Sequence, residues 1–151
     1  MLTKGLDNVP GTSGNDTIIG SIDTSNGGAE LNTLSSLDVV NGGAGIDTLK
    51  IATADSGKTV TLPNLSNVEI IELQGSGTGG KTTIDTSTST GVTDVKVTKI
   101  AENVKAVAAA TTNVDVSMKA VGKTVEVDGA KNVTVKLTDV AANADKVTIG
   151  T

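Results

Sequence analysis

One stretch of the sequence carries residues that could bind a metal ion. From Gly42 to Lys50 the chain reads GGAGIDTLK, which places three glycines just before Asp47 and the apolar Leu49 two residues after it. Glycine permits turn conformations that direct backbone carbonyls toward one point. Asp47 adds a carboxylate there, and Ca²⁺ binds such mixtures of carbonyl and carboxylate oxygens. The stretch therefore predicts a calcium site followed by a short buried strand.

A second, looser copy runs from Gly11 to Ile19 as GTSGNDTII, with Asp16 in the position of Asp47. Each copy has another aspartate nine residues earlier, Asp7 and Asp38. Asp16 and Asp47 are 31 residues apart, so they become neighbours on one side of the fold only if residues 21–36 are looped out. A plainer alternative stays open, in which these are ordinary turn residues and each aspartate bonds its own backbone.

Composition excludes many other kinds of chemistry. The 151 residues include no Cys, His, Phe, Trp or Tyr, which removes thiolate and imidazole catalysis, soft metal ligands and aromatic stacking on sugars or bases. The net charge of -5 argues against a nucleic-acid partner. No apolar run approaches the ~20 residues that span a bilayer, so we expect no membrane insertion. Acid excess without soft ligands favours a hard cation, Ca²⁺.

Short alternating segments predict an all-β fold. Valines at 95, 104, 114, 125, 133 and 147 are mostly 8 to 11 residues apart, and two such strands make a repeating unit of about 20 residues, as in a solenoid. We therefore expect a β-solenoid (β-roll or parallel β-helix). Asn67, Asn103, Asn113 and Asn132 are expected to form a ladder at its turns.

Two segments suggest other structure. Leu31, Leu34 and Leu37 have helical spacing, which predicts a short helical insertion near residues 30–37. Residues 100–110 are rich in alanine, and we favour strand over helix there because the Asn-Val pattern continues. We treat residues 1–151 as one solenoid domain with three zones. These are calcium-binding coils (1–51), strands with a Gly/Ser/Thr loop at 75–91 (52–91), and metal-free Val/Thr/Ala coils (92–151).

Residues 2–9, 11–17 and 34–49 together resemble RTX-type S-layer (surface-array) proteins of Gram-negative bacteria, and the stretch from Gly42 to Lys50 matches the RTX nonapeptide G-G-x-G-x-D-x-U-x. The resemblance implies a calcium-stabilised solenoid, type I secretion, self-assembly into a surface lattice and anchoring to lipopolysaccharide through a separate region. It also implies a set of ligands: the carboxylates of Asp7, Asp16, Asp38 and Asp47, with the carbonyls of Thr3, Gly5, Gly14, Gly43 and Gly45. The chain departs from the family by its few motif copies and its lack of an evident export signal or anchor, so we expect an internal segment of a longer protein.

The sequence therefore predicts a structural protein of the extracellular cell surface, with Ca²⁺ as its cofactor and copies of itself as partners, and not an enzyme. Two alternatives remain open. One is a stalk or adhesin module of a large secreted RTX protein, with a ligand bound on residues 75–91. The other is the export or folding tail of a secreted RTX hydrolase.

Overall fold

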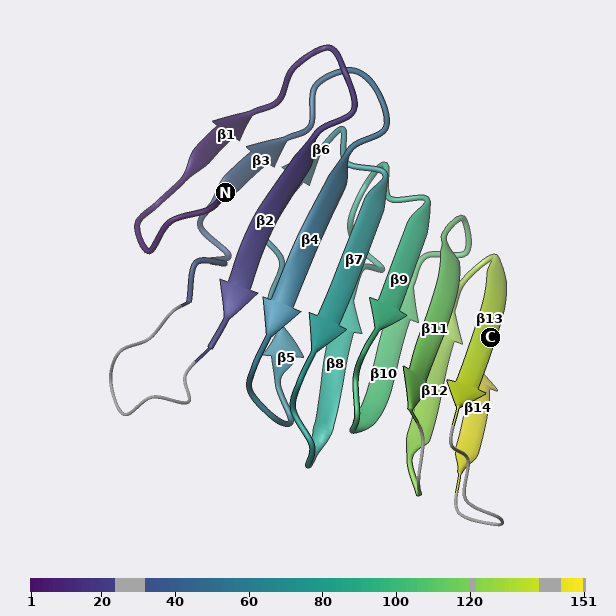
Figure 1. Cartoon of the computed structure of the whole chain (residues 1–151). Helices are drawn as coiled ribbons and strands as arrows, with labels where there is room; N and C mark the ends of the chain where they lie inside the picture. The colour runs from purple at the N-terminus through teal and green to yellow at the C-terminus, as the bar shows by residue number, and fades with distance from the viewer. Residues whose placement is uncertain (24–31, 120–121, 139–144, 151) are drawn as a thin grey trace.

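Alternation of small apolar and polar residues gives most strands an inward and an exposed face, and the strands stack in parallel as a β-solenoid (Figure 1). The structure is a computed structural model that describes residues 1–23, 32–119, 122–138 and 145–150. All pairings between its strands are parallel, so the fold class expected from the sequence is confirmed.

Three parallel sheets form the walls of the solenoid (Figure 1). A six-stranded sheet contains β2 (Thr17–Ile22), β4 (Thr48–Thr53), β7 (Ile70–Gly75), β9 (Asp94–Thr98), β11 (Asn113–Lys119) and β13 (Asn132–Thr138). Behind it, a five-stranded sheet contains β5 (Thr59–Val60), β8 (Lys81–Asp85), β10 (Asn103–Ala108), β12 (Thr124–Gly129) and β14 (Lys146–Gly150). A three-stranded sheet contains β1 (Asn8–Pro10), β3 (Val39–Asn41) and β6 (Asn64–Ser66).

The core consists of columns of aliphatic side chains, one from each coil. Leu49, Ile71, Val95 and Val114 occupy successive register positions in the six-stranded sheet, and each is at most 1% exposed. β-Branched side chains suit this arrangement because they pack closely on a pleated surface. A thin core of this kind is filled without aromatic residues.

The valine spacing noted in the sequence corresponds to the two walls. Val95, Val114 and Val133 lie in the six-stranded sheet, whereas Val104, Val125 and Val147 lie in the five-stranded sheet. Two strands per coil and a unit of about 20 residues are therefore confirmed for this part of the chain, including a strand rather than a helix at β10.

The asparagine ladder is confirmed at one turn. The Asn132 side-chain amide donates to Asn113 Oδ1 at 2.9 Å, and the Asn113 amide donates to Asp94 Oδ1 at 3.1 Å. A hydrogen bond from the Thr93 hydroxyl, more than that from Asn113, lowers the pKa of Asp94 from its usual value. Asn67 and Asn103 also bond across coils, but to Asn41 and to the Thr124 backbone.

Two local expectations are wrong. Residues 32–37 form no helix, while Glu30 and Leu31 lie outside the described residues. Thr33 and Leu34 instead donate their N–H groups to the Ser21 carbonyl, so this segment lies along the edge of β2.

No helix that could span a membrane occurs in the described parts of the chain.

The Gly/Ser/Thr loop expected at 75–91 is the second error, because β8 crosses it. Thr82 and Ile84 alternate inward from this strand and are fully buried. Threonine is β-branched and fits a strand, so two alternate inward residues were enough to extend the five-stranded sheet across a segment rich in turn residues.

A buried carboxylate joins the turn before β5 to strand β8. Glu102 is 1% exposed and accepts the Gly57 N–H at 3.0 Å and the Thr82 hydroxyl. These bonds connect three successive coils. A buried polar group is tolerated when it is hydrogen-bonded in this way.

Glu102→Ala should lower the free energy of unfolding by about 3 kcal/mol, because it leaves a cavity and two unpaired donors. Urea denaturation measures the loss. Glu126→Ala is the matched control, since Glu126 forms an ion pair with Lys81 at 3.1 Å while 30% exposed; its cost should stay below about 1 kcal/mol. Equal losses in the two variants would contradict a role for Glu102 in holding the turns.

Candidate metal centre

The aspartates singled out in the sequence form two stacked pairs. Asp16 donates its backbone N–H to Asp47 Oδ1 at 2.7 Å, and Asp7 donates its N–H to Asp38 Oδ1 at 3.0 Å. The register of β2 with β4 and of β1 with β3 carries the same offset of 31 residues. Asp16 and Asp47 are therefore neighbours on adjacent coils.

In the first coil, the aspartates cap their own turns. The carboxylate of Asp7 accepts both the N–H and the hydroxyl of Thr3, at 2.6 and 3.0 Å. Asp16 Oδ2 accepts the same two groups of Thr12, at 2.6 and 2.9 Å. This is the plainer turn chemistry that the sequence left open, and at Asp7 it occupies both carboxylate oxygens.

The remaining predicted ligands of these turns follow the same pattern. Gly5 and Gly14 direct their N–H groups to the Thr3 and Thr12 hydroxyls. Asp38, which is fully buried, uses Oδ1 for the Asp7 N–H and Oδ2 for the Ser35 N–H at 2.9 Å. The Asp7–Asp38 pair therefore has no oxygen left without a hydrogen bond.

Asp47 differs from the other three aspartates. It is 0% exposed, and its Oδ2 atom has no hydrogen-bond partner among the described residues. The turn of Asp47 has Gly43 at the position that Thr12 occupies in the turn of Asp16, so it offers Asp47 no hydroxyl group. The Gly43 N–H donates to Asn41 Oδ1 and not to Asp47. A buried carboxylate oxygen without a donor is costly, which makes Asp47 the candidate ligand for a cation.

Backbone carbonyls of neighbouring coils approach the glycines of this turn closely. A Cβ on Gly42 would lie 1.8 Å from the Asn67 carbonyl oxygen and 2.5 Å from Asp47 Oδ2. Gly43 has a φ of +97°, and its Cβ would lie 2.0 Å from the Thr12 carbonyl oxygen. Glycine is required at both positions, and its absent side chains let carbonyls from the neighbouring coils approach. Gly45, with a φ of +127°, faces the Gly14 carbonyl in the same way.

Charge is concentrated in this region. Residues 1–48 contain six acidic residues and one lysine, whereas residues 49–151 contain eleven of each. The whole net charge of -5 therefore belongs to the coils that carry the glycine turns. Concentrated negative charge destabilises a compact structure unless cations neutralise it.

The donors at Asp47 fit Ca²⁺ chemically, since Asp47 Oδ2 and nearby carbonyls are hard oxygen ligands. Asp16 can contribute as well, because its Oδ1 accepts no hydrogen bond from the described residues. No group of three acidic side chains converges on one point in the described parts of the chain. The candidate centre is thus narrower than the nine predicted ligands and is built around Asp47.

Sequence analysis missed Glu69. It is half-buried at the turn before β7, and its Oε2 accepts the Asp47 N–H at 2.8 Å. Asp16, Asp47 and Glu69 therefore form one column, in which each carboxylate after the first accepts the backbone N–H of the acid one coil earlier. No motif surrounds Glu69, so only the register of β4 with β7 shows this role.

Gly42→Ala should abolish the close packing at this centre, since its methyl group would overlap the Asn67 carbonyl. We expect a loss of about 2 kcal/mol or more in the free energy of unfolding, measured by urea denaturation with EDTA. Gly79→Ala is the control, because nothing lies within 4 Å of its Cβ position; its effect should stay within about 1 kcal/mol. A Gly42→Ala protein as stable as Gly79→Ala would show that the turn packs less tightly than described.

Comparison of this chain with known proteins gives no relative. No family model matches it, and neither does any curated protein or solved structure. Its function is therefore inferred from its own residues and fold.

Proposed function

We propose that this chain is a structural module of a bacterial surface layer, a solenoid whose first coils are stabilised by Ca²⁺ outside the cell. The observation that carries the proposal is the unpartnered Oδ2 of Asp47, an oxygen of a fully buried carboxylate beside the Gly42 turn. A buried anion of this kind is stabilised by a cation held through oxygen ligands. The RTX resemblance of residues 2–9, 11–17 and 34–49 supports the same assignment.

The proposed role of the metal is to join the N-terminal coils. Residues of three coils surround the candidate centre: Asp16 and Thr12, then Asp47 and Gly42, then Asn67 and Glu69. An ion bound by Asp47 and these turns stabilises the folded state by mass action, because the unfolded chain does not assemble the ligands. Extracellular calcium modules work with a Kd on the order of 10⁻⁴–10⁻³ M, and a site of few charges suits that range.

A structural rather than catalytic role is supported by what the buried acids do. Asp38 and Glu102 accept the backbone N–H groups of Asp7 and Gly57, which belong to other coils. Asp55 forms an ion pair with Lys58 at 3.4 Å within its own turn. Buried acidic side chains thus join neighbouring coils by hydrogen bonds, and such bonds make a solenoid rigid.

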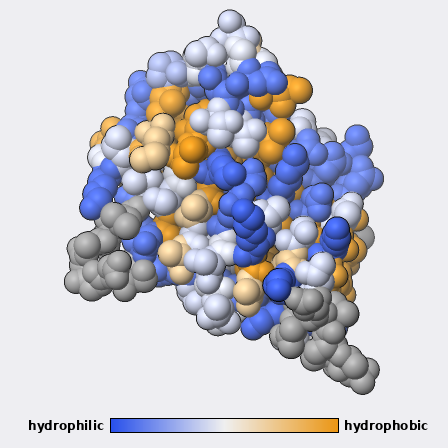
Figure 2. Space-filling model, viewed as in Figure 1, coloured by the Kyte–Doolittle hydropathy of each residue, from blue (hydrophilic) through white to orange (hydrophobic). Residues whose placement is uncertain are grey.

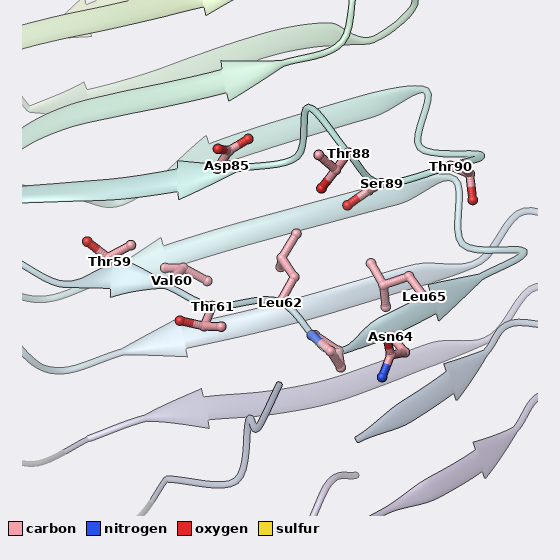
Figure 3. Close-up of a pocket in the computed structure, with 11 residues that line it drawn as sticks. Thr59, Val60, Thr61, Leu62, Asn64, Leu65, Asp85, Thr88, Ser89 and Thr90 are labelled. Carbon is pink, nitrogen blue, oxygen red and sulfur yellow. The ribbon is translucent and has the colours of Figure 1, made fainter. Parts of the chain in front are cut away.

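A groove favours a second candidate function, the stalk or adhesin module with its own ligand. It has a volume of about 480 Å³ and lies where the three-stranded sheet ends at β6 and the five-stranded sheet ends at β5. In Figure 3, Leu62 and Leu65 point across it toward the hydroxyl groups of Thr88 and Ser89. These hydroxyls belong to the segment at 75–91 where a ligand was expected.

The first test is a calorimetric calcium titration of EDTA-stripped protein, with thermal unfolding followed by circular dichroism. We expect heat of binding and a melting temperature that rises with calcium. Asp47→Asn should weaken binding by about tenfold or more, since it removes the ligand charge. Asp85→Asn is a control of equal charge change on the exposed end of β8. Identical titrations of the native protein and Asp47→Asn would refute the centre.

Sedimentation velocity with calcium separates the two candidate functions. A surface-layer module should form larger species as its concentration rises, because each copy is the partner of the next. A stalk module should remain a monomer throughout. A calcium-binding protein that never associates would refute the surface-layer role while leaving the metal centre intact.

A further inference from the structure

The outer face of the six-stranded sheet carries charges in a regular order. A single column across it contains Lys50, Glu72, Lys96 and Asp115, which are register partners on β4, β7, β9 and β11. Their signs alternate from strand to strand. With strands about 4.8 Å apart, the column is a row of alternating charges through the middle of the sheet.

Neutral residues border this row. Ile19 on β2 and Thr134 on β13 complete the column at its two ends. No described segment crosses this face, which looks toward the viewer in Figure 1. In Figure 2 the same face shows hydrophilic, intermediate and scattered hydrophobic residues. This face is therefore open to a partner over the described residues.

Only two of the four charged residues in this row form an ion pair within the chain. Lys50 Nζ lies 3.6 Å from Glu72 Oε1, with 38% and 25% of their side chains exposed. Lys96 and Asp115 are exposed and form no ion pair with another described residue. Two charges of opposite sign are thus left available to a partner.

We propose that this face binds the same face of a second copy, about a two-fold axis that runs along the strands between β7 and β9. Such an axis places Lys50 opposite Asp115 and Glu72 opposite Lys96, so every charge of the row meets its opposite. The inference rests on the proposed function, because it supplies one of the self-contacts that a surface layer needs. Interfaces with complementary potentials gain specificity and suppress wrong arrangements.

The order of charges also selects between the possible arrangements. A two-fold axis running across the strands would place each residue of the row opposite its own copy, so Lys50 would face Lys50 and Glu72 would face Glu72. Like charges in direct contact are unfavourable. The axis along the strands avoids this, and it passes through the centre of the six strands. It also places the 41% exposed Ile19 opposite Thr134 of the partner.

The area of the face predicts a weak contact. Six strands span about 24 Å and six residues per strand span about 20 Å, which gives roughly 500 Å² on each partner. The total of roughly 1,000 Å² lies at the lower limit for a specific interface. A contact of this size is weak in a single pair, and because it depends on exposed charges it weakens further with salt.

The test uses charge exchange, followed by sedimentation velocity of the calcium-loaded protein at increasing concentration. Lys96→Glu and Glu72→Lys each create two like-charge contacts across the axis, and each should weaken association by about tenfold or more. The double variant Glu72→Lys/Lys96→Glu again places opposite charges face to face, so it should restore association. Lys146→Glu, an exposed residue of β14 with the same change of charge, is the control and should associate like the native protein.

The outcomes separate the two proposals. Association that the single variants leave unchanged, or that the double variant fails to restore, overturns this interface and leaves the surface-layer role standing. A native protein that stays monomeric at every concentration overturns both. Circular dichroism and thermal unfolding of each variant serve as the control for folding. A variant that keeps the native spectrum and melting temperature has lost the contact between copies and not its own structure.

Discussion

The structure depends on hydrogen bonding between successive coils. A coil of this protein has too few apolar residues to form a core alone, so it is stable only when its strands and turns bond to the coils on each side. The backbone N–H of Asp16 needs Asp47, and that of Asp47 needs Glu69. The same dependence explains why Asp38 and Glu102 are buried, since each accepts a hydrogen bond from an adjacent coil, Asp38 from the Asp7 N–H and Glu102 from the Thr82 hydroxyl. Stacking thus decides which acidic residues are sheltered from water and which stay on the surface.

Acidic residues serve two purposes in this fold. Most of the buried ones are satisfied by protein donors and behave as turn caps. Asp47 is the exception, because the glycines that let neighbouring carbonyls approach also remove the threonine that satisfies Asp16. The exchange of Thr12 in the first coil for Gly43 in the second therefore changes a self-satisfied turn into one that suits a cation.

The sequence predicted those features that depend on local pattern. Alternation with a period of two identified the strands around Val95, Val114 and Val133, and the glycine motif identified Asp47. Features that depend on register could not be found, because the column from Ile19 to Thr134 advances by 31, 22, 24, 19 and 19 residues. Glu69 and the alternating row of charges are visible only after the coils are aligned. The leucines of 31–37 misled for a different reason: Leu34 packs against Gly20 at the edge of β2, although its spacing imitates a helix.

The direction of the hydrogen bonds makes the mechanical strength of this solenoid depend on the direction of the force. Bonds between parallel strands run along the stacking axis (Figure 1). A pull along that axis is therefore carried by all the junctions between coils in series, and the weakest junction opens first. A pull along the strands loads all the bonds of a junction together in shear. The solenoid therefore resists force along its strands better than force along its stacking axis. A cation bound at the proposed centre beside Asp47 would strengthen the junctions between the first coils, where the negative charge of the chain is concentrated.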